Sequence, residues 1–80
     1  MKIFVDGCEY YVDSNVGGLY VYDIKGRLVG YADIDDNVEQ IGIEWHDAEG
    51  ERDYGSYPYF EYGGDDEELA RWIVSCAPWV

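Results

Sequence analysis

The chain has 80 residues, enough for one domain and too few for a second hydrophobic core. Its formal net charge at pH 7 is -13, since 18 acidic residues stand against 5 basic ones, and this charge opposes direct binding to DNA, RNA or an anionic membrane. Because 48% of the residues are hydrophobic and 18% are aromatic, the composition also excludes a disordered acidic tail.

The first predicted element is a β-hairpin. Residues 2–5 (KIFV) and 8–12 (CEYYV) are rich in strand-forming side chains, and the Asp6-Gly7 pair between them is typical of a tight hairpin turn. A turn over 14–18 leads to a third strand over 19–22, and Lys25-Gly26 connects this strand to a fourth over 27–34. Consecutive strands joined by short turns predict an antiparallel meander.

A fifth strand is predicted over 38–46, where apolar and polar residues alternate. Ile41, Ile43 and Trp45 would lie on the core face, and the residues between them on a solvated face. Residues 47–55 are predicted to form a polar loop. Residues 57–62 could then form a short sixth strand, which Pro58 would confine to an edge of the sheet.

A single helix is predicted over 65–77. Asp65 or Asp66 would cap its N-terminus, acidic residues fill its first turn, and Pro78 would end it. The face packed on the sheet would be the stripe Leu69, Trp72, Ile73 and Cys76. The sequence therefore predicts one domain over residues 1–80 with an α+β fold: a five- or six-stranded antiparallel β-sheet (meander) with one C-terminal helix packed on one face.

The sequence gives no sign of a catalytic or metal site. Cys8, His46 and Cys76 are the only cysteines and histidine, and their spacing matches neither a zinc site nor a known Cys-His pair. We expect both cysteines to be reduced and buried, because one bridge between opposite ends is unlike the dense disulfide frameworks of small secreted domains. We therefore expect a cytoplasmic protein that is not an enzyme and has no cofactor and no metal; no apolar run approaches the roughly 20 residues of a membrane span.

The negative charge is concentrated in residues 33–68, which carry 14 acidic residues and one basic residue. Surfaces that only maintain solubility usually intersperse both signs, whereas a field of one sign steers a protein toward a basic partner. Aromatic residues, tyrosine above all, are interleaved with these acids, and tyrosine is enriched at the centres of interfaces. A solvated face remains the alternative for these acids, and those over 65–68 could simply complement the helix N-terminus.

In its length, its hairpin over 2–12 and its single-signed block over 33–68 with a tyrosine-rich end, the chain resembles small acidic anti-CRISPR inhibitors of phages and mobile elements, including those against type I-C systems. The resemblance implies a monomeric inhibitor in the host bacterial cytoplasm. It would cover the basic DNA-binding or PAM-recognition surface of a CRISPR effector complex subunit and block target DNA binding by DNA mimicry. On this hypothesis the contact residues are Asp33, Asp35, Asp36, Glu39, Glu44, Asp47, Glu49, Glu51, Asp53, Tyr54 and Tyr57.

Two other classes of protein fit the same sequence. An inhibitor of a different nucleic-acid-binding protein, such as a restriction enzyme, a nuclease toxin or a transcription factor, would use the same charges. A structural protein could self-assemble through the tyrosine-rich edge over 57–62, although the net charge opposes close self-association at low salt.

Overall fold

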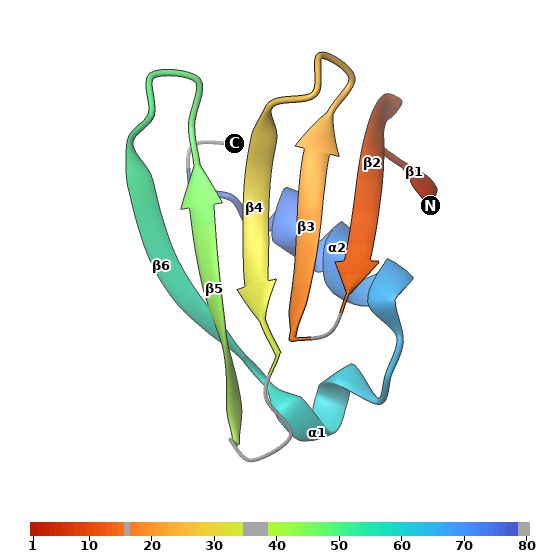
Figure 1. Cartoon of the computed structure of the whole chain (residues 1–80), viewed down its shortest axis with the longest axis vertical. Coiled ribbons are helices and arrows are strands. Elements are labelled where there is room, and N and C mark those ends of the chain that lie inside the picture. Colours follow the sequence, from red (N-terminus) through yellow and green to blue (C-terminus); the bar gives the residue numbers. More distant parts are fainter. Residues whose placement is uncertain (16, 35–38, 79–80) are drawn as a thin grey trace.

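The computed structural model describes residues 1–15, 17–34 and 39–78. In this part of the chain six strands are followed by two helices (Figure 1): β1 (Lys2–Val5), β2 (Cys8–Asn15), β3 (Gly18–Asp23), β4 (Leu28–Asp33), β5 (Gln40–His46), β6 (Arg52–Pro58), α1 (Tyr59–Tyr62) and α2 (Asp66–Ser75). All strands pair antiparallel with their neighbours in chain order, from β1 at one edge to β6 at the other. The predicted α+β meander with a C-terminal helix is confirmed, with six strands.

The turn between β1 and β2 follows from its two residues. Asp6 and Gly7 have φ angles of 52° and 82°, the left-handed conformation that both central residues of a type I′ turn require. Glycine adopts this conformation without strain, and aspartate tolerates it better than most residues. The turn brings Val5 opposite Cys8 and so sets the register of the whole first hairpin.

The sheet has one covered and one open face. Figure 1 is viewed from the open face, and α2 lies behind the sheet. Side chains alternate along each strand, so one set from every strand points toward the helix and forms the core with it. That core consists of Ile3, Val12, Leu19, Val21, Ala32, Ile41, Ile43, Trp45, Tyr57, Leu69, Ala70, Ile73, Val74 and Ala77.

Two residues explain where helix α2 begins and how closely it packs on the sheet. The side chain of Asp65 accepts a hydrogen bond of 3.1 Å from the backbone N–H of Glu68, so Asp65 is the N-cap. At the closest approach to the sheet, a Cβ atom on Gly30 would lie only 2.4 Å from the Cγ2 atom of Ile73. Glycine at this position in β4 therefore allows the helix to lie directly on the strand.

The buried stripe of α2 differs from the predicted one. Leu69 and Ile73 are buried as expected, but Trp72 is only half-buried and Cys76 is exposed. The buried face also includes Ala70 and Val74. The stripe is thus rotated by about one residue, because the large Trp72 ring reaches sideways over β6 instead of pointing into the centre of the sheet.

The C-terminal part of the sheet corrects two further predictions. Strand β6 begins at Arg52, within the predicted polar loop, and residues 59–62 form the short helix α1 instead of continuing a strand. The strand begins early because Asp47 closes a tight turn by accepting hydrogen bonds from the backbone N–H groups of Glu49 (2.9 Å) and Glu51 (2.8 Å). Strand β6 is an edge strand, as the proline at its end predicted.

Both cysteines are exposed and unpaired, whereas burial was expected. Cys8 is the first residue of β2, directly after the hairpin turn, and Cys76 is the C-cap of α2. Each lies at the end of its element. Residues at the ends of strands and helices are covered less by neighbouring elements than residues in the middle. The two small cysteine side chains therefore stay outside the core.

Candidate partner-binding face

The open face of the sheet carries five of the nine tyrosines of the chain. Tyr11 lies opposite Tyr22 across the β2–β3 pair, and Tyr20 lies opposite Tyr31 across the β3–β4 pair. Tyr54 on β6 continues this second row and is 66% exposed. Because neighbouring strands stand about 5 Å apart, the rings of facing tyrosines lie close together, and those of Tyr20 and Tyr31 are in contact.

Four carboxylates stand among these rings on the same face. Strand alternation places Glu9 and Asp13 on either side of Tyr11 on β2, Asp33 beside Tyr31 on β4, and Glu44 on β5. We call this surface the tyrosine–carboxylate face. Its members are Glu9, Tyr11, Asp13, Tyr20, Tyr22, Tyr31, Asp33, Glu44 and Tyr54.

The centre of the face is held by contacts between its own side chains. The rings of Tyr20 and Tyr31 lie 4.9 Å apart between centroids, tilted by 36°. Tyr20 also lies over Gly18, where an added Cβ atom would come within 3.1 Å of the ring. Burial is the main reason that the pKa of the Tyr31 phenol is raised; the charge of Asp33 and a hydrogen bond to its carboxylate add to the shift.

The β1 edge of the face carries a small ionic cluster. The Tyr11 hydroxyl donates to the carboxylate of Glu9, and this hydrogen bond is the largest cause of the raised pKa of Tyr11. The ammonium group of Lys2 lies 3.8 Å from Glu9 and 6.0 Å from the Tyr11 ring centroid. Arg52 stands at the opposite edge, paired with His46 across the β5–β6 ladder. The basic groups of the face are thus confined to its margins, and its centre is negative.

Glu44 occupies a central position. It pairs with Tyr31 on one side and with Tyr54 on the other, so two phenol rings flank its carboxylate. Its Oε2 atom lies 2.6 Å from Nε2 of His46, two residues further along β5. In the described part of the chain its second oxygen, Oε1, makes no hydrogen bond and is available to a partner.

The structure brings together only three of the predicted contact residues: Asp33, Glu44 and Tyr54. Asp35 and Asp36 lie outside the described residues. Glu39 lies at the end of the sheet next to α1, where its backbone carbonyl accepts a hydrogen bond from Tyr59.

The remaining predicted residues point elsewhere. Asp47, Glu49 and Glu51 form the β5–β6 turn at the opposite end of the sheet from Glu39. Asp53 lies opposite Trp45, and its carboxylate accepts from the backbone N–H of the next residue.

Tyr57 does not fit its predicted role as a partner contact. It is only 9% exposed and packs edge-on against Trp72, with 4.9 Å between ring centroids. The ring therefore belongs to the core between β6 and α2, and partner contacts fall to the tyrosines of the open face.

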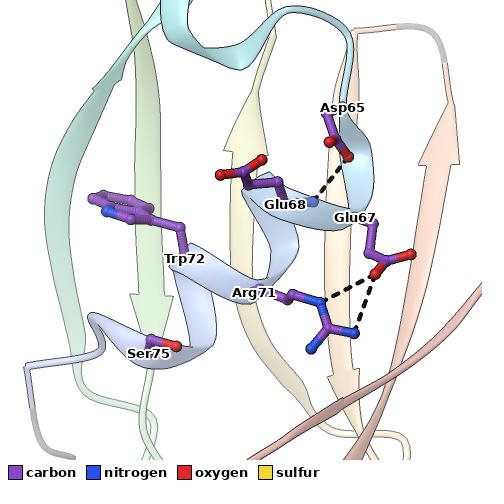
Figure 2. Close-up of a pocket in the computed structure, with 6 residues that line it drawn as sticks. All are labelled: Asp65, Glu67, Glu68, Arg71, Trp72 and Ser75. Carbon is purple, nitrogen blue, oxygen red and sulfur yellow. Dashed lines mark hydrogen bonds and ion pairs between the residues drawn. The ribbon is translucent and has the colours of Figure 1, made fainter.

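A second acidic surface lies on the helix side of the molecule (Figure 2). A shallow groove there is lined by Asp65, Glu67, Glu68, Arg71, Trp72 and Ser75. Two of its carboxylates have structural tasks, because Asp65 caps the helix and Glu67 forms an ion pair of 3.1 Å with Arg71. Arg71 also donates to the carbonyl oxygen of Phe4 at 2.6 Å and so ties α2 to β1. These acids are largely explained by the stability of the helix.

Sequence reasoning missed Tyr11, Tyr20, Tyr22 and Tyr31 as members of the face. Their signal was strand alternation: Leu19 and Val21 are core residues, so Tyr20 and the residue that follows Val21 had to lie on the opposite face. The prediction concentrated on residues 33–68, because most of the acidic residues lie there. The face, however, is assembled from β2 to β6 across the chain.

Within 1–15, 17–34 and 39–78, no group of three or more His, Cys, Asp or Glu side chains could hold a metal ion. The helices in these ranges are too short and too polar to cross a membrane. No family model, curated protein or solved structure matches the chain, so the assignment of the site rests on geometry and charge.

Proposed function

We propose that this chain is an acidic protein inhibitor that docks through its tyrosine–carboxylate face on the basic nucleic-acid-binding surface of another protein and keeps nucleic acid away from it. The observation that carries the proposal is the uncovered face itself, where carboxylates alternate with half-exposed phenol rings across five strands. Tyrosine supplies large contact area at low entropic cost.

The charge supports the same function. A net charge of -13 on 80 residues speeds the encounter with a basic partner and repels nucleic acid that competes for the same surface. Carboxylates on a sheet can occupy the arginine and lysine side chains that otherwise bind phosphates, which is the physical basis of mimicry. Lys2 and Arg52 at the margins leave the centre of the face to the acids.

A CRISPR effector complex is the first partner to test, because of the resemblance to small acidic anti-CRISPR inhibitors. Such complexes read a short PAM and hold the guide–target duplex with arginine and lysine side chains, a surface of complementary charge. The inhibitor would then compete with target DNA for the PAM-recognition or DNA-binding surface.

The proposal is tested by capture and competition. The tagged protein is incubated with a nuclease-treated bacterial lysate that contains an assembled CRISPR complex, and the captured complex is assayed for binding of target DNA. The double variant Asp33→Asn/Glu44→Gln is expected to lose capture. Its matched control, Glu61→Gln/Glu68→Gln, removes the same charge from exposed helical positions outside the face and should retain capture.

The outcomes separate the classes of partner. Recovery of the complex with loss of DNA binding supports the proposal in its CRISPR form. Recovery of a restriction enzyme, nuclease toxin or other basic protein supports the wider form with a different target. Equal loss of capture in both double variants would show that net charge alone acts, and the assignment to this face would then be wrong.

Self-assembly is a second candidate, and one feature favours it. Strand β6 is an edge strand whose residues 52–56 are all exposed, so a second chain could pair with it. The charge of every copy opposes this pairing at low salt. Light scattering over a range of protein and salt concentrations tests this candidate. A molar mass that increases with protein concentration would support self-assembly, and a constant monomer mass would contradict it.

A further inference from the structure

Gly42 leaves an open position on the tyrosine–carboxylate face, in the row of Asp33, next to the row that holds Tyr31 and Glu44. It lies between Asp33 on β4 and Ser56 on β6 in the strand ladder. Apart from its two chain neighbours, no described residue has an atom within 4 Å of the place where its Cβ would be. The other glycines within strands differ: the corresponding place is occupied by Tyr20 at Gly18, by Ile73 at Gly30 and by Trp45 at Gly55. Among the glycines of the described strands, Gly42 alone thus has open space above it, and we call this space, from which only the glycine side chain is missing, the hollow.

Two carboxylates and a serine hydroxyl border this hollow, and two phenol rings lie diagonally from it. Asp33 stands directly across the β4–β5 ladder from Gly42, and Glu44 stands two residues further along β5 on the same face. Diagonal neighbours on a sheet have their Cα atoms about 7–8 Å apart, so one cation can reach both carboxylates. Tyr31 and Tyr54 flank Glu44 and complete the border.

Both carboxylates keep binding capacity for a partner. Asp33 is engaged by the Tyr31 hydroxyl, and Glu44 by His46 through one oxygen. A carboxylate has about four lone-pair sites, so each still has room for charge-assisted hydrogen bonds. Two adjacent negative groups with open space between them attract a cationic side chain.

We propose that this hollow binds an arginine side chain of the partner, with the guanidinium over Gly42 between Asp33 and Glu44. The inference rests on the proposed function and names the chemistry of its contact. A guanidinium is planar, donates in a fork to two carboxylates and stacks on the phenol rings, whereas the ammonium of lysine is a strongly hydrated point charge. The hollow therefore selects arginine over lysine.

The test uses two synthetic peptides of equal length and charge, one with arginine and glycine alternating and one with lysine and glycine. Each is titrated into the 15N-labelled full chain at low salt. The arginine peptide is expected to shift the amide signals of Asp33, Gly42 and Glu44 and to bind about fivefold more tightly or better than the lysine peptide. Equal affinity of the two peptides at the same signals would overturn the selection of arginine and leave docking on a basic partner intact.

A variant that fills the hollow gives the second readout. Gly42→Val adds a strand-forming side chain at a position without positive φ, so the fold is expected to persist. This variant should lose at least about tenfold in affinity for the arginine peptide, the effect of removing one good charge-assisted contact. Asn15→Val places the same isopropyl side chain on β2 of the same face, away from the hollow, and should bind as the parent does.

The remaining outcomes count against the hollow. Full binding of the arginine peptide by a folded Gly42→Val variant would overturn the proposed arginine site. Amide shifts confined to the groove on α2 would overturn it as well. Absence of binding by either peptide at low salt would also overturn it. The capture experiment with the parent chain decides separately whether the proposed function stands.

Discussion

The indole nitrogen of Trp45 donates a hydrogen bond of 2.7 Å to the carbonyl oxygen of Ile73. Ile73 lies in the last turn of α2, where carbonyl groups lack a helical partner, so a tryptophan on the sheet satisfies the end of the helix. The same ring covers Gly55 on β6, where an added Cβ atom would lie 2.7 Å from it, and it packs 5.7 Å from the ring of Trp72. One side chain thus joins β5, β6 and α2.

Trp45→Phe should lower the free energy of unfolding by about 1–3 kcal/mol through the unpaired buried carbonyl, with a further loss from the smaller ring. Urea denaturation followed by circular dichroism measures the change. Trp72→Phe is the matched comparison, because Trp72 is only half-buried and its indole makes no hydrogen bond within the described residues. A loss as large in Trp72→Phe as in Trp45→Phe would contradict this role of the hydrogen bond.

Gly30→Ala should destabilise the fold by about 1–3 kcal/mol, the usual cost of overpacking a core. Its new methyl would lie 2.4 Å from the Cγ2 atom of Ile73, which cannot move away inside the core. Gly42→Ala, by contrast, meets open space and should change stability by less than about 0.5 kcal/mol. Thermal unfolding of the two variants measures both changes in stability. An equal loss of stability in the two variants would show that α2 does not approach β4 closely at Gly30.

The melting temperature should rise with salt. At 0.01 M ionic strength the Debye length is about 30 Å, while the longest dimension of the molecule is 33 Å, so nearly all the acids repel one another. Screening at 0.2 M NaCl should raise the free energy of unfolding by about 1 kcal/mol, which corresponds to a rise of about 4–8 °C in the melting temperature of a domain of this size. The variant Glu49→Gln/Glu51→Gln should respond less because it carries less charge, and a response equal to that of the parent would speak against self-repulsion as the cause.

Stability should fall above pH 10. Burial first, and then the neighbouring Asp33, raises the pKa of Tyr31 above its ordinary value of 10.0. Between that value and the raised pKa the folded chain holds a proton that the unfolded chain has released, so the free energy of unfolding falls as pH rises. Tyr57 behaves in the same way, with burial as the main cause.

Denaturation curves from pH 9 to about pH 11.5, together with absorbance titration of the phenols, measure this dependence. Tyr31→Phe removes one of the shifted groups and should flatten the decline. An unchanged slope in Tyr31→Phe would show that Tyr31 titrates alike in the folded and unfolded chains.

Most of the fold could be predicted from the sequence because its signals are local. The Asp6-Gly7 turn, the alternation around Ile41 to Trp45 and the N-cap at Asp65 each act within a few residues. The region after β5 was less predictable. Aromatic residues after Pro58 favour a strand by propensity, yet the chain turns there: the N–H of Tyr59 bonds to the carbonyl of Glu39, and Gly63 ends α1 with a φ of 57°.

The candidate site was harder to predict, because its members meet only through strand register. Asp33, Glu44 and Tyr54 could be named from charge and aromatic content, but their neighbours Tyr20 and Tyr31 come from the nearly neutral part of the chain. The open space at Gly42 depends on where the side chains of the neighbouring strands point, and no local pattern encodes this.

The strand order also determines how the chain can fold. Every pairing from β1 to β6 joins consecutive strands, so each needs only a short loop to close and little entropy is lost before contacts form. Hairpins can therefore form early and independently along the chain. Helix α2 comes last in the sequence, yet it packs on β1, β2, β3 and β4, and these contacts span most of the chain. Docking of α2 is thus the one step with a long closure distance, and a chain that still lacks this helix would leave both faces of its sheet uncovered.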